Sequence, residues 1–103
     1  GANGAANDGA AQAEVQHAFA ALQVCAKAQG GTFQGCGVDQ VIENEPTLTP
    51  ARSRISVAAA GGSAQVSVPS SSKNVFTIAV DRGVTIRPCR TAGVGACPTS
   101  GRW

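Results

Sequence analysis

Four cysteines place the tightest limit on how this 103-residue chain can fold. An even number of cysteines in so short a chain favours two disulfides and an oxidising location outside the cytoplasm. The sequence predicts the pairs Cys25–Cys36 and Cys89–Cys97, because the members of each pair are close in the chain and separated by turn residues. The alternative is a zinc site, but zinc ligands usually come in closely spaced pairs, and these cysteines are further apart. The only histidine, His17, falls on a predicted helix, so we predict no metal site.

Large side chains for a hydrophobic core are scarce. The chain has three Phe and one Trp but no Tyr or Met, although aromatic residues normally supply much of the buried area. Val, Ile and Ala must therefore fill most of the core. A chain of this length has room for a single domain, which we place at residues 1–103.

A long helix over residues 8–29 is predicted by the spacing of apolar side chains. These recur at intervals of four, three and four at Val15, Phe19, Leu22 and Ala26. That spacing places them on one face of a helix. Asn7 and Asp8 are candidates for the N-cap, and Gly30-Gly31 is expected to end the helix in a left-handed conformation.

The rest of the chain predicts a sheet. Residues 30–52 form a connection, with room for a short helical turn from Val38 to Glu45 before Pro46. Residues 53–88 alternate apolar and polar side chains between turn signals, which is typical of antiparallel strands. The expected strands are 53–59, 63–68, 75–80 and 84–88. The predicted fold class is α+β, with one long N-terminal helix packed on a four-stranded antiparallel sheet and a disulfide-closed C-terminal loop at residues 89–103.

This order of features resembles the type IV pilins and pseudopilins. The run ANDGAAQAEV at residues 6–15 resembles the exposed half of the pilin helix, just after its membrane-embedded half. Phe76-Thr77-Ile78, followed by Gly83, resembles the last hairpin of the pilin sheet. Cys89, together with Cys97 and the tail to Trp103, resembles the C-terminal disulfide loop of pilins from some bacterial lineages. The resemblance covers nearly the whole chain and depends on the order of the motifs.

The resemblance implies a structural subunit of an extracellular type IV pilus or pseudopilus filament, on the bacterial surface, with roles in adhesion or motility. Its partners would be other pilin subunits, and before assembly a membrane, reached through an apolar N-terminal helix. The family signature also includes a leader with a peptidase site and a Glu near the start of that helix. None of these is in this sequence, so we expect it to be the soluble headpiece of a longer precursor.

Two rival functions stay open. One is a minor or competence pilin that binds DNA through a basic C-terminal half. The other is a secreted disulfide-rich inhibitor or adhesin unrelated to pilins. The pilin resemblance itself covers major pilins, minor pilins and secretion-system pseudopilins alike.

No catalytic motif is present in the sequence. His17 has no nucleophile at a motif spacing, and neither G-x-S-x-G nor H-E-x-x-H occurs. We therefore predict that the protein is not an enzyme, that it holds no cofactor, and that His17 is an exposed helix residue. Asp39, Glu43 and Glu45 offer oxygen ligands of the kind that calcium prefers. They lack the spacing of a calcium loop, so we expect a solvated acidic loop.

Charge is divided unevenly along the chain. Residues 1–45 carry one lysine and five carboxylates, whereas residues 46–103 carry seven basic residues and one aspartate. The candidate partner surface comprises Arg82, Arg87, Arg90, Arg102 and Trp103. It could contact DNA phosphates, but single-stranded DNA binding normally needs several stacking rings. We therefore expect weak DNA binding and assign the basic excess to subunit contact or solubility.

Overall fold

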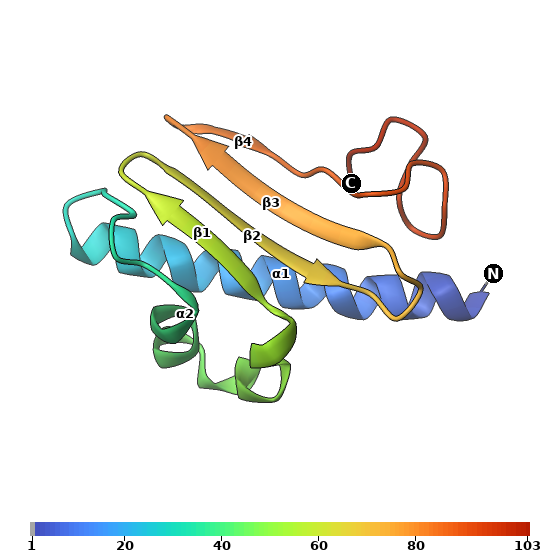
Figure 1. The fold of residues 1–103 in the computed structure, drawn as a ribbon, viewed down its shortest axis with the longest axis horizontal. Helices are drawn as coiled ribbons and strands as arrows, with labels where there is room; N and C mark the ends of the chain where they lie inside the picture. The colour runs from blue at the N-terminus through green and yellow to red at the C-terminus, as the bar shows by residue number, and fades with distance from the viewer. Residues whose placement is uncertain (1) are drawn as a thin grey trace.

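The computed structural model describes residues 2–103, so the predicted domain start at Gly1 lies outside the described residues. It has an α+β fold in which one long N-terminal helix packs on a four-stranded antiparallel sheet, as the sequence predicts (Figure 1). The helices are α1 (Ala2–Ala28), α2 (Val38–Asn44) and the 3₁₀ helix η1 (Pro46–Arg54). The strands are β1 (Ser56–Ala60), β2 (Ser63–Pro69), β3 (Val75–Asp81) and β4 (Val84–Ile86), in the spatial order β1-β2-β3-β4.

Helix α1 begins earlier than the sequence pattern indicates. It starts at Ala2 instead of near Asp8, because alanine has the highest helix propensity and continues the helix without an apolar face. The expected N-cap role of Asn7 or Asp8 is therefore wrong. The C-terminal end is as predicted. Gly30 and Gly31 have φ of 76° and 100°, and the N–H of Gly31 donates to the carbonyl of Ala26 at 2.8 Å.

The connection between helix and sheet is more ordered than a loop. The short helical turn expected after Val38 is α2. The next residues form η1, which delays the first strand from residue 53 to Ser56. Pro46 at the start of η1 loses no hydrogen bond there, because the first N–H groups of a helix have no partner inside it. The last strand also differs from the prediction, ending at Ile86 and not at residue 88.

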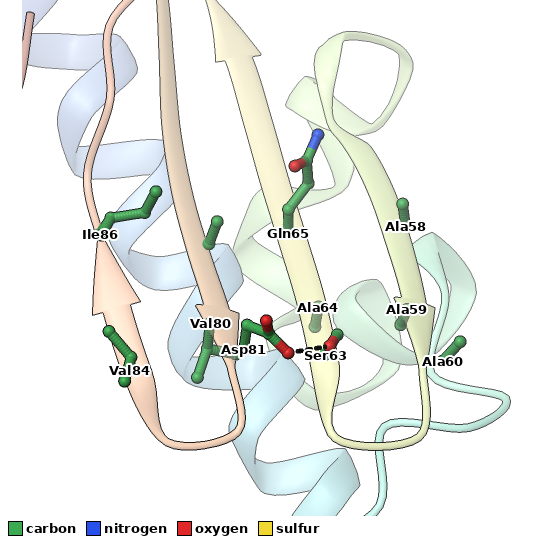
Figure 2. A pocket seen from close by; sticks show the side chains of 11 residues that line it. Ala58, Ala59, Ala60, Ser63, Ala64, Gln65, Val80, Asp81, Val84 and Ile86 are labelled. Carbon is green, nitrogen blue, oxygen red and sulfur yellow. Dashed lines mark hydrogen bonds between the residues drawn. The ribbon is translucent and has the colours of Figure 1, made fainter.

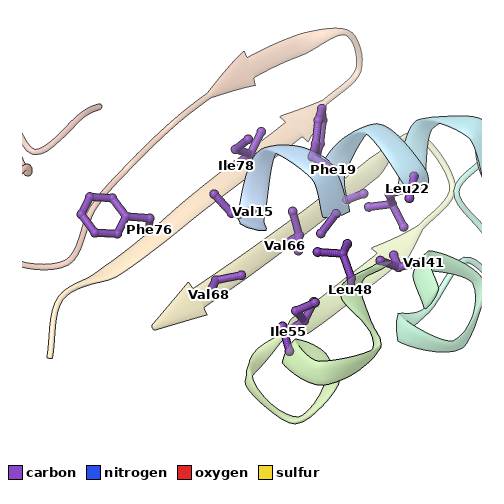
Figure 3. Close-up of a cluster of buried hydrophobic side chains, with 14 of the residues drawn as sticks. Val15, Phe19, Leu22, Val41, Leu48, Ile55, Val66, Val68, Phe76 and Ile78 are labelled. Atoms are coloured by element: carbon purple, nitrogen blue, oxygen red, sulfur yellow. The ribbon is translucent and has the colours of Figure 1, made fainter. Parts of the chain in front are cut away.

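The core lies between α1 and one face of the sheet, with a second contribution from α2 and η1 (Figure 3). Val15, Phe19 and Leu22 are buried on the predicted face of α1, and His17 is exposed on another. The side chains that meet them from the sheet and the connection are Val41, Leu48, Ile55, Val66, Val68, Phe76 and Ile78. Aliphatic side chains thus fill most of the core, as the composition predicts.

Both predicted disulfides are present. Cys25 is joined to Cys36, with their Cα atoms 6.1 Å apart, and Cys89 is joined to Cys97, with their Cα atoms 5.8 Å apart. The first bridge fixes the end of α1 to the start of the connection, and the second closes the C-terminal loop. No helix within residues 2–103 combines the length and apolar character needed to cross a bilayer.

The buried stripe of α1 gives a direct test of the packing. Leu22 is 0% exposed, so Leu22→Ala should lower the free energy of unfolding by about 2–5 kcal/mol through lost burial and a cavity. His17→Ala, on the exposed face, should change it by less than about 0.5 kcal/mol. Urea denaturation of both variants measures the difference, and equal losses would show that the wrong face has been identified as buried.

Candidate functional site

The predicted partner residues do not form one surface. Arg82 lies in the β3–β4 turn with φ of 51°, and its Nε is 3.6 Å from Oδ1 of Asp81. Arg90 and Arg102 are exposed and lie at the C-terminal loop, where Cys89 N–H donates to Gly101 O at 2.8 Å. The basic residues are therefore spread along the β4 side of the molecule (Figure 1).

Arg87 and Trp103 are the two predicted partner residues that the structure brings into contact. The guanidinium carbon of Arg87 lies 3.9 Å from the centroid of the Trp103 ring, a cation–π arrangement. The Nε of Arg87 is buried and has no hydrogen-bond partner among the described residues. Both side chains are half-buried, so part of the basic surface predicted from the sequence is used inside the protein.

Trp103 acts as an anchor for the end of the chain. Its ring meets Phe76 edge-on, with centroids 5.6 Å apart and planes at 87°. Its Nε1 donates to the carbonyl of Thr77 at 3.1 Å, and its backbone N–H donates to the carbonyl of Arg87 at 2.8 Å. One face of the ring is covered by Arg87, which leaves it poorly placed to stack on a base.

The acidic residues of the connection are also engaged. Asp39 forms an ion pair with Arg52, and the Thr47 hydroxyl donates to Glu45. Among the described residues, no group of three or more His, Cys, Asp or Glu side chains could hold a metal ion. Glu43 is exposed on α2.

Asp8 is the site residue that the sequence pattern missed. Its side chain is 0% exposed although it lies in the first half of α1. Oδ1 accepts from the Ser72 hydroxyl at 2.5 Å, and Oδ2 accepts from the backbone N–H of Ala96 at 2.9 Å. One carboxylate therefore joins the helix to the β2–β3 turn and to the C-terminal loop.

The surroundings of Asp8 favour the ionised form. Burial raises the pKa of Asp8, but hydrogen bonds from the Ser70 and Ser72 hydroxyls and from the Ala96 N–H outweigh burial and leave the pKa below its usual value. Gly95 approaches so closely that a Cβ there would overlap the carboxylate. Its φ of 58° is also in the left-handed region that favours glycine.

Asn74 holds the same loop from the other side. Its side chain is 1% exposed, and its Nδ2 donates to the carbonyls of Thr91 and Val94 at 3.2 and 3.1 Å. Its Oδ1 accepts the backbone N–H groups of Val75 and Thr91, both at 3.0 Å. All the strong hydrogen-bonding groups of this amide are used, so Asn74 fixes the position of the disulfide loop against β3.

The outer face of the sheet carries a shallow hollow of about 860 Å³ (Figure 2). Small side chains from β1 and β3, including Ala58, Ala60 and Ala79, form its floor and one border. Val84 and Ile86 of β4 form the other border and are 66% and 39% exposed. Large apolar side chains on the outer face of this sheet are thus confined to the β4 edge.

A scan against models of protein families and searches of curated proteins and of solved structures found no match to this chain.

The Asp8 contacts predict a measurable loss of stability on substitution. Asp8→Asn should lower the free energy of unfolding by about 1–3 kcal/mol, because an amide whose oxygen accepts from Ala96 presents an NH2 donor, and no acceptor, to the Ser72 hydroxyl. Asn7→Ala, at the exposed neighbouring position, should have little effect. Urea denaturation at neutral pH measures both, and equal stabilities of the two variants would contradict this role.

Acidification provides a second readout of the same prediction. Because the folded-state pKa of Asp8 is lowered, its contribution is complete above the unfolded value of about 3.9 and is lost as pH falls through the folded value. The stability difference between the natural chain and Asp8→Asn should therefore shrink below about pH 4.

DNA binding is predicted to be weak and electrostatic. We expect a dissociation constant of about 10⁻⁴–10⁻⁶ M at physiological salt, weakening steeply as salt rises, because Trp103 already contacts Arg87 and Phe76. Titration of labelled DNA at two salt concentrations tests this. Arg90→Ala removes an exposed charge at the C-terminal loop, and Lys27→Ala removes one at the end of α1 as the matched control. Tight binding that survives high salt and is lost only in Arg90→Ala would favour the DNA-binding alternative.

Proposed function

We propose that this chain is the headpiece of a type IV pilin-like subunit, which assembles into an extracellular filament and acts structurally and not as an enzyme. The observation that carries the proposal is the arrangement of a single 27-residue helix under a four-stranded antiparallel meander, followed by a disulfide-closed C-terminal loop. The proposal places the protein at the bacterial surface, with other pilin subunits as its partners and a membrane contact before assembly.

The position of α1 supports this proposal. A helix of this length spans about 40 Å, close to the 43 Å longest extent of the molecule. Figure 1 shows its N-terminal turns reaching past the strands at one end of the molecule. An apolar helix that continued α1 from there would leave the headpiece along the helix axis without crossing the sheet.

The two bridges support an extracellular role. They restrain the end of α1 and the C-terminal loop. Disulfides persist in oxidising surroundings and commonly stabilise small extracellular domains. The secreted inhibitor or adhesin remains the rival that shares this property, so the test must separate it from a filament subunit.

Immunogold electron microscopy of the source cells tests the proposal. An antibody raised against this chain should label surface filaments, and labelling should disappear in a strain from which the gene is deleted. The coding sequence before Gly1 should also encode an apolar stretch of about 20 residues after a short basic leader. A freely secreted antigen behind an ordinary secretion signal would contradict the filament function and favour the inhibitor or adhesin.

A further inference from the structure

The sheet is open at both edges. In the order β1-β2-β3-β4, β1 pairs only with β2, and β4 pairs along its length only with β3. Unpaired strand edges present rows of N–H and C=O groups that can add another strand. Strands alternate in direction, so β1 and β4 run antiparallel to each other within one molecule.

The turns determine which backbone groups face outward. Gly61-Gly62 and Arg82-Gly83 are two-residue turns, so the pairs that close them, Ala60↔Ser63 and Asp81↔Val84, are hydrogen-bonded. Hydrogen-bonded and non-hydrogen-bonded pairs alternate along an antiparallel ladder. The N–H and C=O groups of Thr85 on β4, and of Val57 and Ala59 on β1, therefore point to the open edges.

The chain itself begins a ladder on the outer side of the β4 segment. Pro88 and Arg102 form an antiparallel bridge, and the N–H of Trp103 donates to the carbonyl of Arg87 at 2.8 Å. Trp103 is held in place by Phe76. The carbonyl of Arg87 is thus already bound, and the next outward-facing groups along the edge are those of Thr85.

Charges that are left over after internal pairing differ between the two sides. Within the described residues, Glu14 pairs with Arg54 and Asp39 with Arg52. Exposed Glu43 remains on α2, which lies on the β1 side of the sheet (Figure 1). Exposed Arg90 and Arg102 remain near the end of the β4 segment. The unpaired arginines therefore lie on the β4 side, whereas Arg52 and Arg54 on the β1 side are paired.

We infer that the β1 edge of one copy of this chain adds to the β4 edge of a second copy, continuing the sheet in antiparallel register. Because the Arg87 carbonyl is occupied, the register places Val57 opposite Thr85 and Ala59 opposite Gly83. The contact joins two different edges, so it is heterologous and repeats without closing. It rests on the proposed filament function, for which it supplies a contact between neighbouring headpieces.

A two-fold contact between two β4 edges is the competing arrangement. It would bring together Arg82, Arg90 and Arg102 from both copies, and like charges across an interface are unfavourable. In the β1–β4 register, Arg90 instead lies level with residue 52 of the neighbour, where Arg52 and Arg54 are already paired with Asp39 and Glu14. Figure 2 shows Ala58 on β1 and Val84 on β4 on the same face, at opposite borders of the hollow.

Cysteine cross-linking of the full chain tests the register. Ala58 and Val84 would face each other across copies at a non-hydrogen-bonded position, with Cα atoms about 4.5 Å apart, a separation that a disulfide can bridge. All four native cysteines are already bridged among the described residues. A chain carrying both Ala58→Cys and Val84→Cys should form a ladder of disulfide-linked oligomers under mild oxidation. Each single variant should stay monomeric, and a mixture of the two should give dimers only.

A backbone variant and a control variant sharpen the test. Thr85→Pro removes the N–H that faces the open β4 edge and leaves the hydrogen bonds to β3 in place, so it should lower the rate of cross-linking by roughly threefold to tenfold. His17→Cys, on the exposed face of α1, should form no ladder with Ala58→Cys. Circular dichroism of each variant verifies that it is folded.

The outcomes separate this contact from the filament function. Folded double-cysteine chains that stay monomeric, or Val84→Cys chains that dimerise alone, would overturn the β1–β4 contact even where filaments are labelled. A ladder formed by a chain that labels no filaments would overturn the pilin-like function and leave the self-association in place.

Discussion

The packing of one face of α1 against the sheet is the contact on which the other features of this structure depend. Phe19 and Leu22 reach into a face made almost entirely of Val, Ile and Ala side chains. A core this poor in aromatic residues yields little free energy beyond the cost of ordering the chain. The segments at the ends of that core therefore need other restraints. The Cys25–Cys36 bridge restrains the end of α1, and the Cys89–Cys97 bridge restrains the C-terminal loop.

Buried polar groups position the loop that the second disulfide closes. A bridge alone shortens the loop without orienting it, whereas Asp8 and Asn74 orient it through hydrogen bonds to its backbone. Hydrogen bonds to a charged carboxylate are stronger than those between neutral groups. Asp8 lies on the helix and Asn74 precedes β3. The loop is therefore hydrogen-bonded to both the helical layer and the sheet. The Trp103 anchor then continues this fixed loop along the edge of the sheet.

The periodicity of the sequence made most of the fold predictable. The contacts between residues far apart in the chain could not be predicted from it. The α1 stripe, the turn glycines and the cysteine spacing are local patterns, and each led to the element or bridge observed. The boundary errors at Asp8 and at residue 53 share a cause, since alanine and η1 extend helical structure without an apolar period. Asp8 contacts Ser72 and Ala96, which lie 64 and 88 positions further along the chain. No local sequence signal marks such contacts. The contact between Asp8 and the C-terminal loop can be recognised only once the helix is known to begin at Ala2. The pilin-like identity stays a proposal drawn from the order of elements.

Open sheet edges carry a risk of aggregation that the fold has to limit. Long, flat, apolar edges pair indiscriminately, and short strands with charged neighbours limit this. β4 has three residues, β1 has five, and the exposed arginines lie beside β4. The same shortness makes a single edge contact weak, because few backbone hydrogen bonds can form. A weak contact becomes effective when a second attachment holds the subunits near each other and raises their local concentration. In the proposed filament, a shared helical core would supply that second attachment. The edges would then pair only between subunits that are already aligned. A weak edge contact can therefore be selective without causing aggregation.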